Sequence, residues 1–457
     1  MANVQPTREL AAFFADLSYE SLPEPVRERV TNIVLDTIAS ALAGRHGDET
    51  AQIEALATAI GGAKSSTVIA GPKQSLAGAT LVNGYQITAV TVCDIHRPTL
   101  CHVTPEVVPP AVAVAEERGS SGRDLLVAVA AGLEAVVRAG AGMRYPSMRA
   151  RGWHSPGVIG PFGGATAVAS LLGLDAGRFQ NAPSLAGTQS AGTFAHWGTP
   201  TIKFHQSRGA YSGLLAGLLS EQGFKAGPEI FTAEHGGLFN LYSDGGDPAA
   251  AVKGLGETWL LDTISLRLWP AGSSIQSVIT AVLALTEEHD LVPADVEAIE
   301  VGQSKAVHDM HGTLPWDNRF RALLSTPYVT GVVLHDRKCW LDQFEPERIA
   351  DPALDAFIRE RVRVTIDDSV EGTGALVSVR TTDGRTLTDR RAHPRGDMAD
   401  PLSREEIVNK FRESADGLLS VDDTERAIEM LIGLADLPNV SDLCAALSRF
   451  RSVAAAT

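Results

Sequence analysis

The chain has 457 residues, of which 44% are hydrophobic and only 6% aromatic, and its formal net charge at pH 7 is −16. This length favours two domains over one, and the excess of Ala, Gly and Leu over aromatic residues favours closely packed helices over a β-sandwich. An acidic surface argues against a nucleic acid or an anionic membrane as partner, but it leaves room for a locally basic pocket that binds an anionic substrate.

The cysteines and the N-terminus indicate in which cellular compartment the protein is expected. Cys93, Cys101, Cys339 and Cys444 form no C-x-x-C pair, which is typical of a reduced protein without a disulfide framework. The first ten residues lack the apolar core of a secretory signal, and no uncharged apolar run reaches membrane-spanning length. We therefore expect a cytoplasmic protein.

Helical periodicity dominates the first 260 residues or so. Apolar residues recur every three or four positions over 7–44, and segments rich in Ala, Val, Gly and Leu follow over 50–90, 104–140, 157–175 and 207–224. Pro109 and Pro110 suit the first turn of a helix, so we expect a helix to begin there.

The pattern changes near residue 262. Alternating residues predict a strand over 262–270, a helix over 274–289 and a second strand over 296–302. The segments 361–369 and 375–391 predict a hairpin whose turn is marked by Asp383-Gly384. Ser403, with Glu406 three residues later, marks the start of further helices. The predicted fold class is mainly α, with a large all-helical domain of residues 1–261 and 396–457 and a smaller α+β domain of residues 262–395.

The residues most suited to chemistry gather in two segments. The stretch from Trp153 to Gly237 contains His154, Lys203, His205 and His235 among small residues, and Asp94–His102 precedes it. Imidazole and amine groups move protons near neutral pH. We expect the two segments to form one pocket that carries out proton chemistry on a small anion.

The first segment allows three interpretations. Asp94, His96 and His102 lie within nine residues, so His102 could act as acid or base with Asp94 as an orienting or substrate-binding carboxylate. A metal site is less well supported, because no matching third ligand is evident. The remaining interpretation is a loop whose polar groups satisfy one another.

The second segment is also open to a structural interpretation. His154 precedes an apolar helix, whose N-terminus favours anions, but an arginine-rich capping turn would produce the same pattern. Lys203 could bind a carboxylate or have a lowered pKa, although most lysines extend to solvent. The sequence contains no P-loop, no G-x-S-x-G motif and no cysteine triplet for an iron–sulfur cluster, and G-P-F-G-G-A does not match the dinucleotide fingerprint.

An ordered series of motifs resembles the MmgE/PrpD family, which includes 2-methylcitrate dehydratases, cis-aconitate decarboxylases and iminodisuccinate epimerases. The resemblance covers nearly the whole chain and rests on V-L-D-T-I-A-S-A-L-A-G, D-I-H-R-P-T-L-C-H, W-H-S-P-G-V-I-G-P-F-G-G-A, L-A-G-T-Q-S-A-G, L-L-S-T-P-Y and H-P-R-G-D-M-A-D-P-L-S. It implies an all-helical domain with a smaller α+β lid, usually a homodimer, and no required cofactor.

The resemblance also implies roles for individual residues. It places His102, His154, Lys203 and Tyr328 among the pocket residues, and we predict these four as catalytic. The chain departs from the family pattern at His96, which replaces a small hydroxyl residue, at Arg267, which replaces a lysine, and at Gly272-Ser273, where relatives often have a histidine or cysteine. Arginine keeps the charge, whereas the missing histidine argues against cis-aconitate decarboxylation. The predicted substrate-binding residues are Asp94, His96, His205, Arg267 and Ser273, and we predict no metal ligand.

The shared chemistry would be removal of a proton near a carboxylate of a small di- or tricarboxylic acid, without a cofactor. We predict a dehydratase, that is, a hydro-lyase similar to 2-methylcitrate dehydratase. The alternatives are an epimerase of a dicarboxylate such as iminodisuccinate, a decarboxylase of the cis-aconitate type, and a non-catalytic homologue that binds a small acid.

Overall fold

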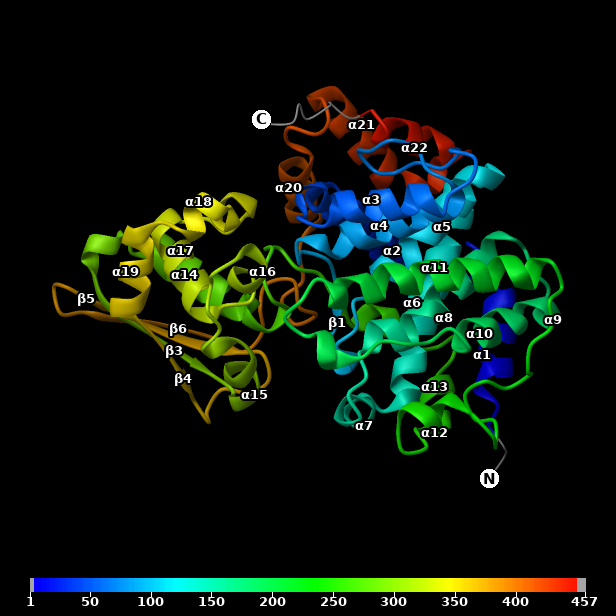
Figure 1. Cartoon of the computed structure of the whole chain (residues 1–457), viewed down its shortest axis with the longest axis horizontal. Helices are drawn as coiled ribbons and strands as arrows, with labels where there is room; N and C mark the ends of the chain where they lie inside the picture. The colour runs from blue at the N-terminus through cyan, green and yellow to red at the C-terminus, as the bar shows by residue number, and fades with distance from the viewer. Residues whose placement is uncertain (1–3, 450–457) are drawn as a thin grey trace. The chain divides into compact units, whose positions relative to one another are not determined.

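The structure is a computed structural model that describes residues 4–449. Its internal contacts divide the chain into two compact units. Within the described residues, the first unit contains the chain up to Ala89, Cys93–Ser265 and the chain from Ser403 onward, and the second contains Val90–Val92 and Leu266–Leu402. The protein is mainly α, as predicted (Figure 1).

The first unit is almost entirely helical, and its one small sheet pairs β1 with β2 in antiparallel orientation. Its helices and strands are α1 (Pro6–Ala15), α2 (Glu24–Ala43), α3 (Thr50–Ala59), α4 (Leu76–Ala89), β1 (Ile95–His96), α5 (Thr104–Arg118), α6 (Gly122–Met143), α7 (Tyr145–Ala150), α8 (Ser155–Leu171), α9 (Ala176–Phe179), α10 (Asn181–Gly187), α11 (Thr201–Glu221), α12 (Leu238–Tyr242), α13 (Pro248–Val252), β2 (Ile264–Ser265), α20 (Arg404–Ala415), α21 (Val421–Ile432) and α22 (Ser441–Leu447).

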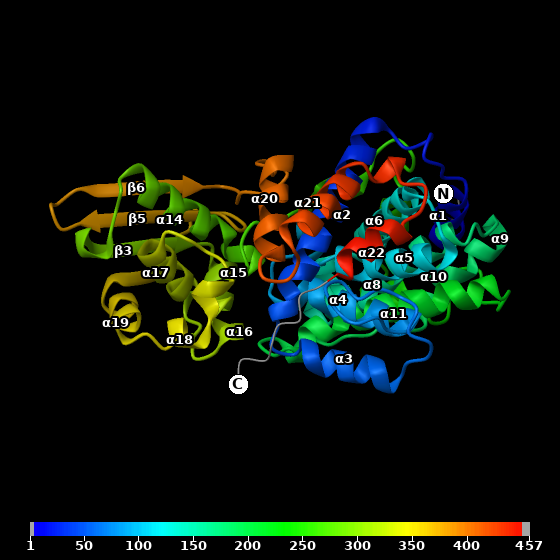
Figure 2. The same ribbon diagram turned by 90° about the horizontal axis from the view of Figure 1, so that it is seen from above.

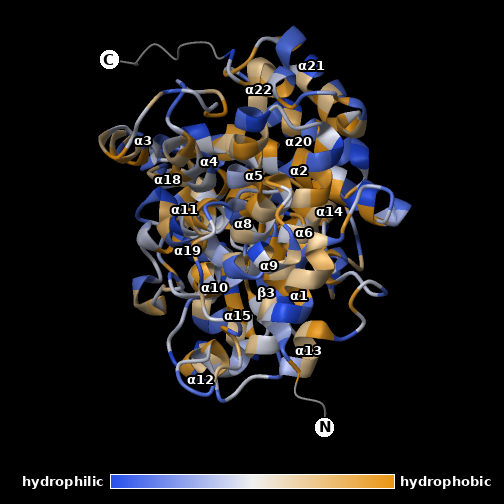
Figure 3. Ribbon diagram, turned by 90° about the vertical axis from the view of Figure 1, so that its right-hand side faces the viewer, coloured by the Kyte–Doolittle hydropathy of each residue, from blue (hydrophilic) through white to orange (hydrophobic). Residues whose placement is uncertain are grey.

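The core of the first unit is built around α6 and α8. These helices pack against each other, and α8 also packs along α5 and α11 (Figure 1). Hydrophobic residues concentrate along α5, α6 and α8 in Figure 3. α6 is long and apolar enough to cross a membrane, but 94% of its most apolar window is buried inside the protein, as in a core helix. Small residues allow α8 and α11 to approach each other closely. A Cβ at Gly213 of α11 would lie only 2.7 Å from the Ala165 nitrogen of α8, so a larger residue would not fit there without a shift.

The second unit combines helices with a four-stranded sheet in the order β4-β3-β5-β6. β3 is parallel to β4 and antiparallel to β5, which forms a hairpin with β6. Figure 2 shows α14 beside the strands, and α14, α17 and α19 contribute buried residues to the core of this unit. The elements are α14 (Gln276–Glu288), β3 (Val296–Gln303), α15 (Lys305–Val307), α16 (Arg319–Ala322), α17 (Thr326–Asp336), α18 (Pro346–Ile349), α19 (Pro352–Arg361), β4 (Val362–Ile366), β5 (Ala375–Thr381) and β6 (Thr386–Arg391).

Several local predictions can be compared with this fold. The hairpin of 375–391 and the capping box of Ser403 and Glu406 are confirmed. The 361–369 segment does not join that hairpin, because β4 pairs with β3 instead. The strand predicted over 262–270 is wrong in extent, since only Ile264–Ser265 pairs as β2. Pro109 and Pro110 do not open a helix, because α5 begins at Thr104 and carries both prolines inside.

Candidate active site

The loop from Asp94 to His102 is closed by its own hydrogen bonds. The His96 amide donates to the Cys101 carbonyl at 2.8 Å, and the Cys101 amide donates back to the His96 carbonyl at 3.3 Å. The buried Asp94 carboxylate accepts from the Val103 amide at 2.8 Å and from the Thr104 amide and hydroxyl at 3.1 and 2.6 Å. Asp94 therefore satisfies exposed donors at the start of α5, where a negative charge is favoured.

The ring of His102 is oriented by the same loop. Its Nδ1 lies 2.6 Å from the main-chain carbonyl oxygen of Asp94. A carbonyl oxygen only accepts hydrogen bonds, so Nδ1 carries a proton and donates. In the neutral ring the second nitrogen, Nε2, is then the basic one. The predicted orienting role of Asp94 is thus played by its main chain.

The start of α8 lies beside this loop. His154 occupies the N-cap position of α8, and the hydroxyl of the next residue, Ser155, donates to the Leu100 carbonyl at 2.8 Å. The charge of His102 contributes to lowering the pKa of His154, after burial and the charge of His205. The two segments singled out in the sequence therefore meet in the first unit.

His154 forms a buried pair with His205 of α11. Their Nδ1 atoms lie 3.1 Å apart, and each residue is only 7% exposed. Burial lowers the pKa of His154 well below its usual value, and the charges of His205, His102 and Arg149 lower it further. Burial, Arg208 and His196 lower the pKa of His205 to about 4. Both rings are therefore neutral at pH 7, and one Nδ1–H donates to the other Nδ1.

A proline within α8 helps to hold this pair in place. Pro161 has no amide hydrogen, so the carbonyl of Gly157 has no helical donor at that position. The Gly157 oxygen instead accepts from the Ala191 amide at 3.0 Å and from the Arg208 guanidinium at 3.1 Å. Arg208 also binds the carbonyl oxygens of Gln189 and Ala191, both at 2.8 Å. The loop that passes the histidine pair is thus fixed to α8 and α11.

Gly192 in this loop has a specific reason to be glycine. Its φ is +153°, and a Cβ there would lie 3.1 Å from Nδ1 of His205. Its carbonyl oxygen accepts from the His154 amide at 3.0 Å. The G-T-Q-S-A-G motif therefore brings main chain rather than side chain against the imidazole pair.

Sequence reasoning missed the cation next to this pair. The guanidinium carbon of Arg149 lies 3.4 Å from the centre of the Phe194 ring, and that ring packs edge-on against His154 at 5.9 Å between centroids. Arg149 is half-buried, and it supplies a positive charge near neutral imidazoles. The arginine-rich turn before Trp153 was the available signal, but its pattern equally fits a solvated capping turn.

A buried carboxyl group, Glu106, was also missed. It lies in the first turn of α5 and is fully buried, and neither carboxylate oxygen has a hydrogen-bond partner among the residues that the structure describes. A Cβ at Gly160 of α8 would lie 2.4 Å from its Cγ, and one at Gly209 of α11 would lie 3.0 Å away. Burial raises the pKa of Glu106 well above its usual value, and the negative charge of Asp94 raises it further, so both effects favour the neutral acid.

Glu106→Gln should make the protein less sensitive to alkaline pH. The folded-state pKa of Glu106 is raised, so the wild type is favoured below the unfolded pKa of Glu and loses stability as the pH rises through the folded value. Relative to Glu106→Gln, the wild type should lose up to about 1.4 kcal/mol per pH unit over that window. Urea unfolding of both proteins at several pH values from 5 to 9 measures this difference, and a difference that does not change with pH would contradict the neutral state of Glu106.

Of the three other predicted residues of the first unit, two make contacts of their own and one is exposed. The buried Lys203 lies on α11 with His205, and its ammonium donates to the carbonyl oxygen of Ala89. The Nδ1 of His96 lies 2.7 Å from the Thr99 hydroxyl, and burial lowers its pKa to about 4. His235 is exposed in a turn. We call His102, His154 and His205 the histidine cluster. The catalytic and substrate-binding roles of these residues remain predictions.

Arg267, Ser273 and Tyr328 lie in the second unit. Arg267 is 1% exposed, and its guanidinium donates to the Ala271 carbonyl at 3.0 Å. Ser273 begins the short 3-10 helix Ser273–Ile275. The Tyr328 hydroxyl donates to the Gln343 carbonyl at 2.6 Å, and burial raises the pKa of Tyr328. In this structure Tyr328 belongs to the core of the second unit, and its hydroxyl binds main chain.

A histidine that sequence reasoning overlooked lies against Gly272. A Cβ at Gly272 would lie 3.3 Å from Cε1 of His311, which is 2% exposed in a π-helical turn, His308–Gly312. The Nδ1 of His311 lies 2.8 Å from the Leu324 carbonyl oxygen, so it carries the proton and Nε2 is the basic nitrogen. Burial lowers the pKa of His311 to about 4. The sequence at Gly272-Ser273 lacks a histidine, but the fold supplies an imidazole at that place.

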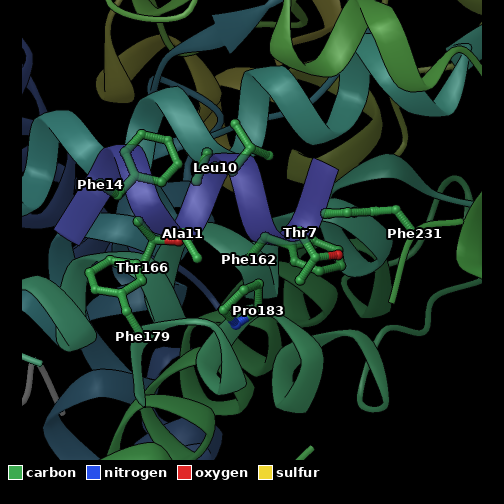
Figure 4. Close-up of a pocket in the computed structure, with 10 residues that line it drawn as sticks. Thr7, Leu10, Ala11, Phe14, Phe162, Thr166, Phe179, Pro183 and Phe231 are labelled. Carbon is green, nitrogen blue, oxygen red and sulfur yellow. The ribbon is translucent and has the colours of Figure 1, made fainter. Parts of the chain in front are cut away.

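A separate pocket in the first unit is apolar. It has a volume of about 10 Å³, which accommodates one water-sized molecule, and Figure 4 shows α1 contributing Thr7, Leu10, Ala11 and Phe14 to it. Its other lining residues, such as Phe162, Phe179 and Phe231, carry no charge. This pocket is too small and too apolar for a di- or tricarboxylate. Among residues 4–449, no group of three or more His, Cys, Asp and Glu side chains is placed to hold a metal ion.

Comparison with known proteins confirms the resemblance seen in the motifs. The MmgE/PrpD N-terminal domain matches residues 8–251, and the MmgE/PrpD C-terminal domain matches residues 269–435. The chain belongs to the MmgE/PrpD family. The N-terminal family domain contains all three residues of the histidine cluster, and the C-terminal family domain contains Ser273, His311 and Tyr328.

Full-length relatives within the MmgE/PrpD family include fungal and mammalian proteins. A cis-aconitate decarboxylase-like protein of Aspergillus oryzae is 27% identical over 97% of both chains. A cis-aconitate decarboxylase of Aspergillus terreus is 25% identical over 96% of this chain and 94% of its own. The cis-aconitate decarboxylase of Homo sapiens is 26% identical over 96% of this chain and 93% of its own.

Proposed function

We propose that this protein is a lyase that acts on a small di- or tricarboxylic acid and moves a proton at a carbon next to a carboxylate. The observation that carries the proposal is the histidine cluster, in which the loop of His102 is hydrogen-bonded to the start of α8 beside the buried neutral pair of His154 and His205. Neutral imidazoles accept and donate protons near pH 7, which is what chemistry at such a carbon requires. Family membership and the full-length relatives support the choice of a carboxylic acid as substrate.

The proposed roles follow from the hydrogen bonds of each ring. His102 holds its Nδ1 proton on the Asp94 carbonyl, so its Nε2 is the proposed base or, once protonated, the proposed acid. His154 is the second proton-transfer group. Arg149 is proposed to bind a substrate carboxylate, because a guanidinium binds it with two parallel hydrogen bonds and stabilises charge that develops on it. Lys203, Arg267 and Tyr328 remain candidates by position in the sequence.

Two lyase reactions are compatible with these roles. The names of the relatives favour decarboxylation, in which the bond to carbon dioxide breaks, the electron pair remains on carbon, and an imidazolium protonates that carbon. Elimination of a β-hydroxyl, the reaction predicted from the sequence, is the second candidate, in which a histidine removes the proton and the hydroxyl leaves as water. Both reactions use the same residue types.

Proton NMR in D₂O with a panel of small acids tests the proposal. The panel contains cis-aconitate, 2-methylcitrate, citrate, malate, tartrate and iminodisuccinate. Loss of carbon dioxide would establish decarboxylation, and new vinyl signals without carbon dioxide would establish elimination. Deuterium incorporation without a new skeleton would establish an epimerase and refute the lyase. No change in any acid, with a correctly folded protein, would favour the non-catalytic homologue.

A further inference from the structure

The histidine cluster reaches the surface of the first unit through His196. This exposed residue ends the short 3-10 helix Phe194–His196. The ring centroids of His196 and His205 lie 6.0 Å apart in an edge-on arrangement. His205 in turn lies 3.1 Å from His154 between the two Nδ1 atoms. The three imidazoles are therefore successive neighbours, from the buried His154 to the exposed His196.

We propose that His205 and His196 relay protons between His154 and solvent. The proposal rests on the proposed function, because a relay has a purpose only if His154 exchanges a proton with the substrate. It also gives His205, predicted from the sequence as a substrate-binding residue, a positioning and relay role that acts through His154. His196 was not singled out in the sequence.

The proton transfers follow from the pairing of the two buried rings. Suppose that His205 carries its proton on Nδ1 and His154 carries its proton on Nε2. When His205 accepts a proton at Nε2 from the side of His196, its Nδ1–H bond breaks and a new Nδ1–H bond forms on His154 across 3.1 Å. His154 then releases its Nε2 proton to the substrate carbon. After the transfer His205 carries its proton on Nε2 and His154 carries its proton on Nδ1, and the same transfers in reverse, which carry a proton from carbon to solvent, restore the starting tautomers.

The charges around the pair disfavour an imidazolium on either ring. Arg149 acts on His154, Arg208 lies on the same helix as His205, and His102 and His196 lie near the two ends. The permanently charged groups that act on the pair are therefore cations, and both rings are buried. An imidazolium in this setting is disfavoured relative to its neutral form, so neither ring stores a proton.

His196→Ala tests the relay on a residue whose loss should not affect folding, because its side chain is exposed. In dilute buffer, on the acid identified by the NMR panel, turnover (kcat) should fall by about tenfold with KM within about twofold of the wild type. Concentrated imidazole should restore most of the lost turnover, because a small soluble base replaces the missing relay. His235→Ala, another exposed histidine of the first unit, is the matched control and should change neither value.

Nitrogen-15 NMR of the histidine side chains tests the pairing without substrate. At pH 7, one ring of the pair should carry its proton on Nδ1 and the other on Nε2, and His205→Gln should change the chemical shifts of His154. Two rings with the same tautomer, or two cationic rings, would refute the relay. So would turnover of His196→Ala equal to that of His235→Ala in dilute buffer, or a loss that imidazole does not restore. If no acid reacts with the wild type, the proposed function fails, and the NMR result still decides whether the pair exists.

Discussion

His102→Ala and His154→Ala should each reduce turnover by about 10²–10⁴-fold while the protein stays folded. His102 is half-buried and lies outside the buried core, and its Nδ1 contacts the Asp94 carbonyl oxygen at 2.6 Å and the Cys93 sulfur at 3.8 Å, so we expect the variant to fold. His154 is more buried than His102. However, its lowered pKa means that the neutral ring destabilises the folded state at low pH, and the variant lacks this penalty. Steady-state kinetics on the acid identified by NMR measures the effect, and circular dichroism with thermal unfolding verifies the fold.

The control for these variants is His235→Ala, which removes an exposed imidazole from the same unit and should leave turnover unchanged. If both His102→Ala and His154→Ala kept near wild-type activity, the histidine cluster would not be the site of chemistry. If only one of the two variants lost activity, the histidine replaced in that variant would be the group that exchanges a proton with the substrate.

The sequence predicted the parts of the site that depend on local order. D-I-H-R-P-T-L-C-H predicted a loop in which the Asp94 carboxylate orients His102 or binds substrate; in the structure the main-chain carbonyl of Asp94 accepts from His102, whereas the carboxylate binds the start of α5. W-H-S-P predicted a helix that begins beside His154, and α8 begins at Ser155. These features depend on residues a few positions apart, so the pattern of one segment contains the information.

The parts that the sequence did not predict depend on distant segments. His154 and His205 are 51 positions apart, and only the packing of α8 along α11 brings their rings together. Glu106 has the sequence of an ordinary acidic residue in a first helical turn, which is normally exposed, and the glycines that bury it belong to two other helices. His311 fills the space at Gly272 because a π-helical turn and Leu324 position it there. Burial of this kind is a property of the assembled fold.

A buried ion pair joins α20, one of the last helices of the chain, to α2 in the first unit. Lys410 of α20 donates to the Asp36 carboxylate of α2 at 2.6 Å, and the two side chains are 0% and 1% exposed. α2 and α20 lie far apart in sequence, and both belong to the first unit. Lys410→Met should lower the free energy of unfolding by about 3–5 kcal/mol, because it leaves the Asp36 carboxylate buried without its ammonium.

A control variant separates the effect of breaking the buried pair from the effect of losing any positive charge on α20. Arg412→Met removes a cation from the same helix, but its partner Glu425 and Arg412 itself are 42% and 47% exposed, so the loss should be at most about 1 kcal/mol. Adding Asp36→Asn to Lys410→Met should recover part of the stability, since no buried charge then lacks its partner. Urea unfolding of the four proteins measures these differences. Equal losses for Lys410→Met and Arg412→Met would mean that burial of the Asp36–Lys410 pair does not hold α20 on α2, and that apolar packing alone returns the end of the chain to the first unit.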